Sequence, residues 1–152
     1  MSGWQDYRNQ WERAGKGELT PMPTHMDLEL TTACNLRCVY CPQNLPHKQG
    51  FVIAENAYAW LEQARRIGVL SVKLNWRGEA TLHPQFRSIA AYANEMGFLD
   101  VMLNTNGMYS ARLRDVLHRF TTLIFSLDAL DERILDHLRP GSDARIIMDN
   151  LS

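Results

Sequence analysis

Four short stretches with strand-like patterns, each followed by a stretch with helical periodicity, constrain the fold of this chain most strongly. The strand-like stretches alternate apolar and polar residues, or carry β-branched and aromatic residues, over residues 26–31, 72–76, 100–104 and 122–127. The helical patterns span residues 55–67, 84–97, 113–120, 134–138 and 143–151. Strands separated by helices predict right-handed crossovers and a parallel α/β sheet.

The two faces of the predicted sheet differ in polarity. One phase of the strands is apolar and the other is polar, whereas parallel strands covered by helices on both sides are apolar throughout. The polar phase consists of Glu29, Thr31, Lys73, Asn75, Asn104 and Ser126. We therefore predict a curved sheet, a partial (βα) barrel with helices on its convex face and a polar pore. The alternative is a sheet with one face simply exposed to water. Glu29 and Lys73 are expected to pair in the pore or to contact substrate.

Each predicted strand ends in a distinctive turn. In chain order these turns are residues 34–41, 76–84, 104–107 and 126–129. Parallel α/β folds place their chemistry at the carboxyl ends of the strands, so the four turns are expected to converge on one site.

The first turn, CNLRCVYC, contains Cys34, Cys38 and Cys41, and the chain of 152 residues has no other cysteine. An odd cysteine count argues against a disulfide framework and for metal or thiol chemistry in a reducing compartment. One alternative that the residues leave open is a Cys3His zinc site completed by His25 or His47, with His47 favoured.

Charge and hydropathy exclude several classes of partner. The net charge of -1 gives no electrostatic basis for binding nucleic acid or an anionic membrane. The polar N-terminus lacks the apolar region of a signal peptide, and no apolar run approaches the roughly 18 residues of a spanning helix. These features predict a cytoplasmic protein.

The motifs resemble those of the radical SAM superfamily. Residues 34–41 fit its CxxxCxxC pattern, with Tyr40 as the usual aromatic residue before the last cysteine. Gly78 and Glu79 resemble the end of its GGE motif, residues 104–107 its NTNG turn, and residues 126–128 its SxD motif. The stretch 138–151 is similar to the arginine-containing segment of the branch with SPASM or related extensions, which includes peptide maturases.

The resemblance implies a 4Fe-4S cluster and S-adenosylmethionine as cofactors. It implies that three thiolates occupy three irons and leave the fourth iron for S-adenosylmethionine. Reductive cleavage would then give a 5'-deoxyadenosyl radical that abstracts hydrogen from a peptide or other polar substrate. An electron donor such as flavodoxin or ferredoxin is implied as a partner.

The resemblance also implies a role for each matching residue. Cys34, Cys38 and Cys41 would ligate the cluster, Tyr40 would lie against adenine, and Glu79 would accept a hydrogen bond from the methionine ammonium. Arg139 would pair with the carboxylate, and Ser126 would meet the carboxylate or ribose. Gly78 and Asp128 belong to the matching motifs, and Asn104 and Thr105 are candidates for the ribose side.

Two departures from the family pattern stand out. Arg77 occupies the place of the first glycine of GGE, and Ala80 that of a following proline, which predicts a displaced backbone around Glu79. The predicted organisation is an N-terminal helical extension over residues 1–24 and an incomplete core over 25–152, truncated after about four βα units. The chain is then expected to be an enzyme if the barrel is completed, and the alternative is an inactive cluster-binding remnant.

Overall fold

The computed structural model describes residues 3–42 and 48–151 and contains one sheet of four parallel strands. The strands are β1 (His25–Asp27), β2 (Ser71–Lys73), β3 (Asp100–Thr105) and β4 (Thr122–Phe125). They are neighbours in sequence order, and Asp27, Lys73, Met102 and Thr122 lie along one row of the ladder. The parallel α/β architecture predicted from the alternating patterns is therefore confirmed.

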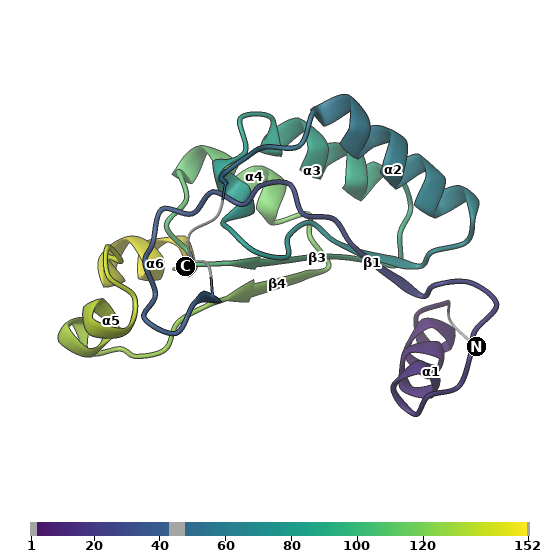
Figure 1. Ribbon diagram of the computed structural model, residues 1–152, viewed down its shortest axis with the longest axis horizontal. Coiled ribbons are helices and arrows are strands. Elements are labelled where there is room, and N and C mark those ends of the chain that lie inside the picture. Colours follow the sequence, from purple (N-terminus) through teal and green to yellow (C-terminus); the bar gives the residue numbers. More distant parts are fainter. Residues whose placement is uncertain (1–2, 43–47, 152) are drawn as a thin grey trace.

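Helices cover one face of this sheet. They are α2 (Ala54–Arg66), α3 (Phe86–Glu95) and α4 (Arg114–Leu117), which lie side by side above the strands in Figure 1. Two further helices, α5 (Glu132–Leu138) and α6 (Ala144–Leu151), follow β4 and lie beyond its carboxyl end. Single 3-10 turns, η2 (Ala80–Leu82) and η3 (Ala111–Leu113), precede α3 and α4. Among the described helices, none combines the length and apolarity needed to cross a membrane.

The apolar phase of the strands forms the core with these helices. Leu30, Val72, Leu74 and Leu103 are fully buried, and they belong to one hydrophobic cluster with the small and branched residues of α2 and α3. Burial of such side chains stabilises the fold by about 1.5–3 kcal/mol each. The opposite phase of the ladder carries Lys73 and Asn104, as predicted, but also Met102 and Ile124, so this face is mixed in polarity.

The strands are shorter than the patterns predict. The first strand was expected to continue to residue 31, but its ladder with β2 ends near Leu28, whose N–H donates to the Lys73 carbonyl at 2.8 Å. Beyond this point the chain changes partner, and Thr31 forms an antiparallel bridge with Phe51. The expected helix over residues 113–120 is likewise only η3 and the single turn α4.

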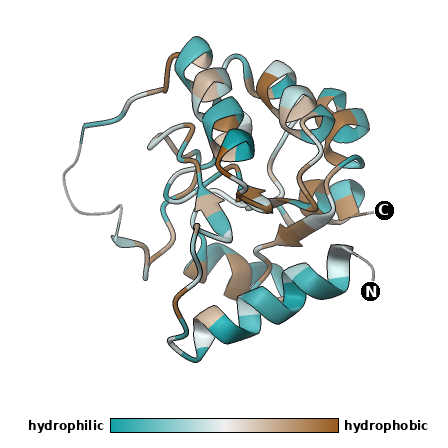
Figure 2. Cartoon of the chain, turned by 90° about the vertical axis from the view of Figure 1, so that its right-hand side faces the viewer, coloured by the Kyte–Doolittle hydropathy of each residue, from teal (hydrophilic) through white to brown (hydrophobic). Residues whose placement is uncertain are grey.

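Helix α1 (Gly3–Gly15) closes the amino end of the sheet, opposite the end where α5 and α6 lie (Figure 1). Most of its surface is hydrophilic, as Figure 2 shows. Its aromatic residues Tyr7 and Trp11 contact residues at the start of the strands. Tyr7 is 1% exposed, and its hydroxyl donates to the Asp100 carboxylate at the start of β3 at 3.2 Å. Trp11 packs edge-on against His25 at the start of β1.

We expect Tyr7→Phe to lower the free energy of unfolding by about 1 kcal/mol, because it removes one buried hydrogen bond and keeps the ring. Urea unfolding monitored by circular dichroism measures this change. Tyr92→Phe is the matched control, since its hydroxyl also donates to a carboxylate, that of Glu62, but at an exposed site. Equal effects of the two substitutions would show that the Tyr7 contact does not anchor α1.

Candidate functional site

The four turns that follow the strands meet at one pocket of about 280 Å³. The cysteine loop (residues 34–41) forms one wall, and residues from the turns after β2, β3 and β4 form the others. The lining residues are Cys34, Leu36, Cys38, Tyr40, Cys41, Pro42, Asn75, Trp76, Arg77, Gly78, Glu79, Asn104, Thr105, Asn106, Ser126 and Arg139. Every residue to which the family resemblance assigns a role is in this set except Asp128, which contacts Tyr40 and Arg139 from outside it.

The cysteine loop presents three thiols to this pocket. All three side chains are partly buried, and none of them forms a disulfide. Burial raises the pKa of Cys34 and of Cys38, and the Arg139 guanidinium opposes the rise at Cys38. A tight turn in which the Cys41 N–H donates to the Cys38 carbonyl at 3.0 Å sets the orientation of the last two cysteines. Three thiols on one short loop are a donor set that suits an iron-sulfur cluster.

An aromatic and ionic group lies beside Cys38. Arg139 donates through Nε and Nη2 to the two carboxylate oxygens of Asp128, at 2.6 and 3.2 Å, and its guanidinium lies 5.6 Å from the centre of the Tyr40 ring. The Tyr40 hydroxyl donates to the same carboxylate. These contacts lower the pKa of Asp128, whereas burial and the bond to Asp128 raise the pKa of Tyr40 to about 12. Tyr40 therefore stays a neutral donor and Asp128 an anion at neutral pH.

Glu79 lies at the base of the pocket and is 2% exposed. Its carboxylate accepts hydrogen bonds from the Asn106 N–H (2.8 Å), the Thr105 hydroxyl (3.0 Å), and the hydroxyl and N–H of Thr81 (2.7 and 3.3 Å). Burial raises the pKa of this carboxyl, and the hydrogen bonds oppose the rise. Because four donors of its own chain already contact it, Glu79 joins the turn after β2 to the turn after β3.

The turns after β3 and β4 contribute polar groups on the other side of the pocket. The side-chain carbonyl oxygen of Asn104 is buried and has no hydrogen-bond partner among the described residues. An unsatisfied buried acceptor is costly, so it fits a ligand that brings a hydroxyl donor. Ser126 directly follows β4 and lines the same pocket, and its N–H donates to the Thr105 carbonyl at 2.8 Å.

Asn106 is a site residue that the sequence analysis did not single out. Its side-chain N–H donates to Asn35 Oδ1 at 2.8 Å and lies 3.9 Å from Cys34 Sγ, while its Oδ1 accepts from the Met108 N–H at 2.9 Å. It therefore ties the cysteine loop to the turn after β3. The signal was present in the NTNG motif, but an Asn-Gly pair is also a common generic turn.

We expect Asn106→Ala to destabilise the fold by about 1–2 kcal/mol, because three polar contacts are lost at a buried position. Asn35→Ala removes only one of those contacts, at an exposed residue, and should cost clearly less. Urea unfolding of both variants and of the double variant gives the coupling between the two side chains. Full additivity of the two substitutions would contradict a direct bond between them.

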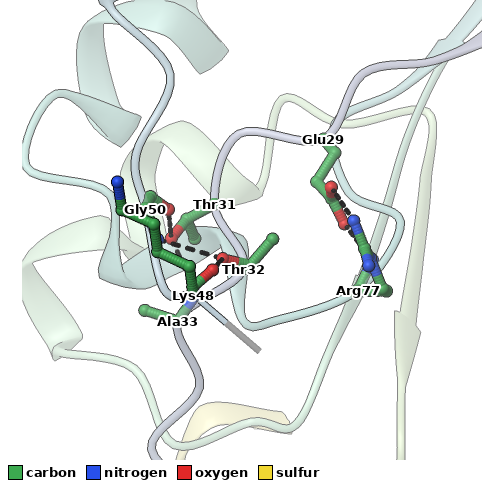
Figure 3. A network of polar contacts seen from close by, with 7 residues as sticks. All are labelled: Glu29, Thr31, Thr32, Ala33, Lys48, Gly50 and Arg77. Atoms are coloured by element: carbon green, nitrogen blue, oxygen red, sulfur yellow. Dashed lines mark hydrogen bonds and ion pairs between the residues drawn. The ribbon is translucent and has the colours of Figure 1, made fainter. Parts of the chain in front are cut away.

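Glu29 and Lys73 do not pair, which corrects the expectation from their shared face. Lys73 Nζ lies 2.8 Å from the carboxylate of Asp27, its direct neighbour in the ladder. Glu29 lies past the end of the ladder and accepts hydrogen bonds from Arg77 Nε and Nη2, both at 2.9 Å, and from its backbone N–H at 3.0 Å. Figure 3 shows the two side chains of this pair pointing toward each other. Arg77, which occupies the place of the first glycine of the GGE motif, is therefore held at the wall of the pocket by Glu29.

A second network in Figure 3 fastens the residues just before the cysteine loop. The Thr31 hydroxyl donates to the Gly50 carbonyl at 2.7 Å and accepts from the Ala33 N–H at 2.9 Å. The Thr32 hydroxyl accepts from the Gly50 N–H at 3.0 Å. The backbone that leads into Cys34 is therefore fixed by its contacts with Gly50.

His25, one of the two candidate zinc ligands, lies at the opposite end of β1 from the cysteine loop. Its Nδ1 lies 2.6 Å from the Ser71 hydroxyl and its Nε2 lies 3.3 Å from Asp27 Oδ1. His25 is therefore not a fourth ligand for these thiols. His47 lies outside the described residues.

Comparison with protein families and curated proteins places these motifs in context. The model of the radical SAM superfamily matches residues 28–152. An S-adenosylmethionine-dependent nucleotide dehydratase from Selenomonas ruminantium is 26% identical over 86% of this chain and 49% of its own length. A PqqA peptide cyclase from Methylorubrum extorquens is 31% identical over 80% of this chain and 29% of its own.

Solved structures share the fold. SuiB from Streptococcus suis, bound to S-adenosylmethionine, superposes with a TM-score of 0.76 at 20% identity, covering 96% of this chain and 34% of SuiB. The methylornithine synthase PylB gives a TM-score of 0.64 at 18% identity, over 84% of this chain and 40% of PylB. The chain spans about half or less of the length of the curated relatives it matches.

Proposed function

Because this chain belongs to the radical SAM superfamily, which implies a 4Fe-4S cluster and S-adenosylmethionine, we propose that Cys34, Cys38 and Cys41 hold the cluster. A reduced cluster bound there would supply the electron for cleaving S-adenosylmethionine to a 5'-deoxyadenosyl radical, and this radical would abstract hydrogen from the substrate. The observation that carries this proposal is the convergence of the three thiols with the other predicted site residues on one pocket. Three thiolates leave one iron of a cubane open to another ligand.

Several residues of the pocket suit S-adenosylmethionine. The buried side-chain oxygen of Asn104, which has no partner in the described part of the chain, offers an acceptor for a ribose hydroxyl, and Thr105 and Ser126 line the same pocket. Tyr40 offers an aromatic face, 57% exposed, against which adenine would stack. Arg139 offers a largely buried positive charge to attract the carboxylate, although its Nε and Nη2 already donate to Asp128.

The predicted contact of Glu79 with the methionine ammonium stays a prediction. Four donors of the chain already contact its carboxylate, which favours a role in holding the turns at the pocket. Gly78, immediately before it, lines the pocket, and its lack of a side chain lets its backbone pack against the carbonyls of Thr31 and Ala33.

A peptide is the substrate class that we favour. The match with PqqA peptide cyclase supports it, as does the fold shared with SuiB, whose structure with the precursor peptide SuiA also superposes. The polar residues on the sheet face next to the pocket would offer hydrogen bonds to a peptide. We further propose a reducing compartment such as the cytoplasm, where three thiols persist, and a flavodoxin or ferredoxin as electron donor.

Anaerobic reconstitution with iron and sulfide, followed by iron counting and EPR of the reduced protein, tests the proposal. We expect about four irons per chain and an EPR signal that shifts when S-adenosylmethionine binds the open iron. Cys38→Ala should lose the intact cluster, while Arg87→Gln, which removes an exposed ion pair with Asp115 at residues that do not line the pocket, should retain it. A cluster whose signal ignores S-adenosylmethionine would indicate the inactive remnant, and one bound zinc without iron would contradict the proposal.

A further inference from the structure

The segment after α5 runs alongside the cysteine loop and places Arg139 opposite Cys38. The Val39 N–H donates to the Leu138 carbonyl at 3.0 Å, and the Arg37 N–H donates to the Pro140 carbonyl at 3.2 Å. These two bonds set an antiparallel register in which residue 38 faces residue 139. Arg139 Nη1 lies 3.7 Å from Cys38 Sγ, within hydrogen-bond distance for sulfur.

Contacts within the chain hold the Arg139 guanidinium in place. Asp128 engages Nε and Nη2, so Nη1 is the nitrogen that is left to point at the thiol. The Arg139 side chain is 11% exposed, and its partner Asp128 is itself bonded by Tyr40. A buried and anchored cation acts on a nearby charge far more strongly than a mobile one at the surface.

Resting on the proposed function, we propose that Arg139 is a positioning residue that donates a hydrogen bond to the Cys38 thiolate and raises the reduction potential of the cluster. Reduction adds one electron to the cluster from an external one-electron donor, and Arg139 keeps its proton throughout. Added negative charge is stabilised by a neighbouring cation and by hydrogen bonds to ligand sulfur. Asn106, a neutral donor at a longer distance from Cys34, would contribute less.

The test is the midpoint potential of the reconstituted protein, titrated by EPR in the absence of S-adenosylmethionine. Arg139→Gln should shift the potential to more negative values, with the reduction equilibrium about tenfold less favourable, which is about 59 mV for one electron. Arg139→Lys keeps the charge and should shift it less. Arg87→Gln is the matched control, because Arg87 also pairs with a carboxylate, that of Asp115, but at a distant exposed site.

A measurement on the unaltered protein covers the case in which Arg139→Gln does not retain its cluster. Pulsed EPR on protein containing arginine labelled with nitrogen-15 should reveal a weak nitrogen coupling to the reduced cluster, which disappears in Arg139→Lys. Absence of this coupling, or equal potentials for the parent protein and Arg139→Gln, would overturn the inference and leave the proposed function intact. Failure of the parent protein to form a cluster that responds to S-adenosylmethionine would instead reject the proposed function itself.

Discussion

Glu79→Ala is expected to lower the free energy of unfolding by about 3 kcal/mol and to impair cluster loading. The substitution removes one carboxylate and leaves the N–H groups of Asn106 and Thr81 and two threonine hydroxyls without their acceptor. Since Asn106 also contacts Cys34 and Asn35, the loosened turn releases one wall of the pocket. Urea unfolding and iron content after reconstitution measure the two effects.

Glu79→Gln separates charge from hydrogen bonding at the same position. The amide keeps the shape, and the threonine hydroxyls can rotate to accept from it, so we expect a loss of only about 1 kcal/mol near neutral pH. Burial raises the pKa of Glu79 in the folded protein, so its contribution to stability is greatest below the ordinary pKa of a glutamate. That contribution falls as pH rises from the ordinary pKa through the raised one.

Unfolding measured across this pH range should therefore show a component that Glu79→Gln removes. Thr81→Val offers a further comparison, because it deletes one donor to the carboxylate and keeps the charge. If Glu79→Ala were no more harmful than Thr81→Val, Glu79 would not be the group that joins the two turns.

Gly78→Ala is expected to destabilise the fold by about 3 kcal/mol, through strain and steric overlap together. Gly78 has a φ of +61°, and a Cβ at this position would lie 2.4 Å from the Thr31 carbonyl oxygen and 2.7 Å from that of Ala33. Both atoms are backbone, and the network around Thr31 and Thr32 holds them in place. Relief of the overlap must displace the chain that enters Cys34, so cluster loading should fall as well.

Gly68→Ala is the matched control for this prediction. Gly68 has a φ of +89°, but a Cβ there meets no atom within 4 Å. Only the conformational cost remains, which is about 1 kcal/mol. The excess of Gly78→Ala over Gly68→Ala in urea unfolding measures the overlap, and equal losses would show that the backbone around Thr31 yields freely.

The periodicity of the sequence predicts most of the fold, because it reports which side of each element is buried. Residues 72–76 and 100–104 carry their apolar side chains in one phase, and Val72, Leu74, Val101 and Leu103 are all buried. Strand ends were less predictable. Leu30 has the right phase for a longer β1, but its carbonyl accepts from the Val52 N–H, a partner that no local pattern indicates.

The sequence by itself determined the donor set of this protein and its place in the fold. Three cysteines within one turn, and polar turns after each strand, are local features, and the order of a parallel sheet brings such turns to one edge. The tertiary structure decided which charges meet. Glu29 binds Arg77 instead of Lys73, Glu79 is buried under four donors, and Arg139 reaches Cys38 from 101 residues away. Such partners depend on where the chain bends after each strand ends, and that geometry is set by packing across the whole domain.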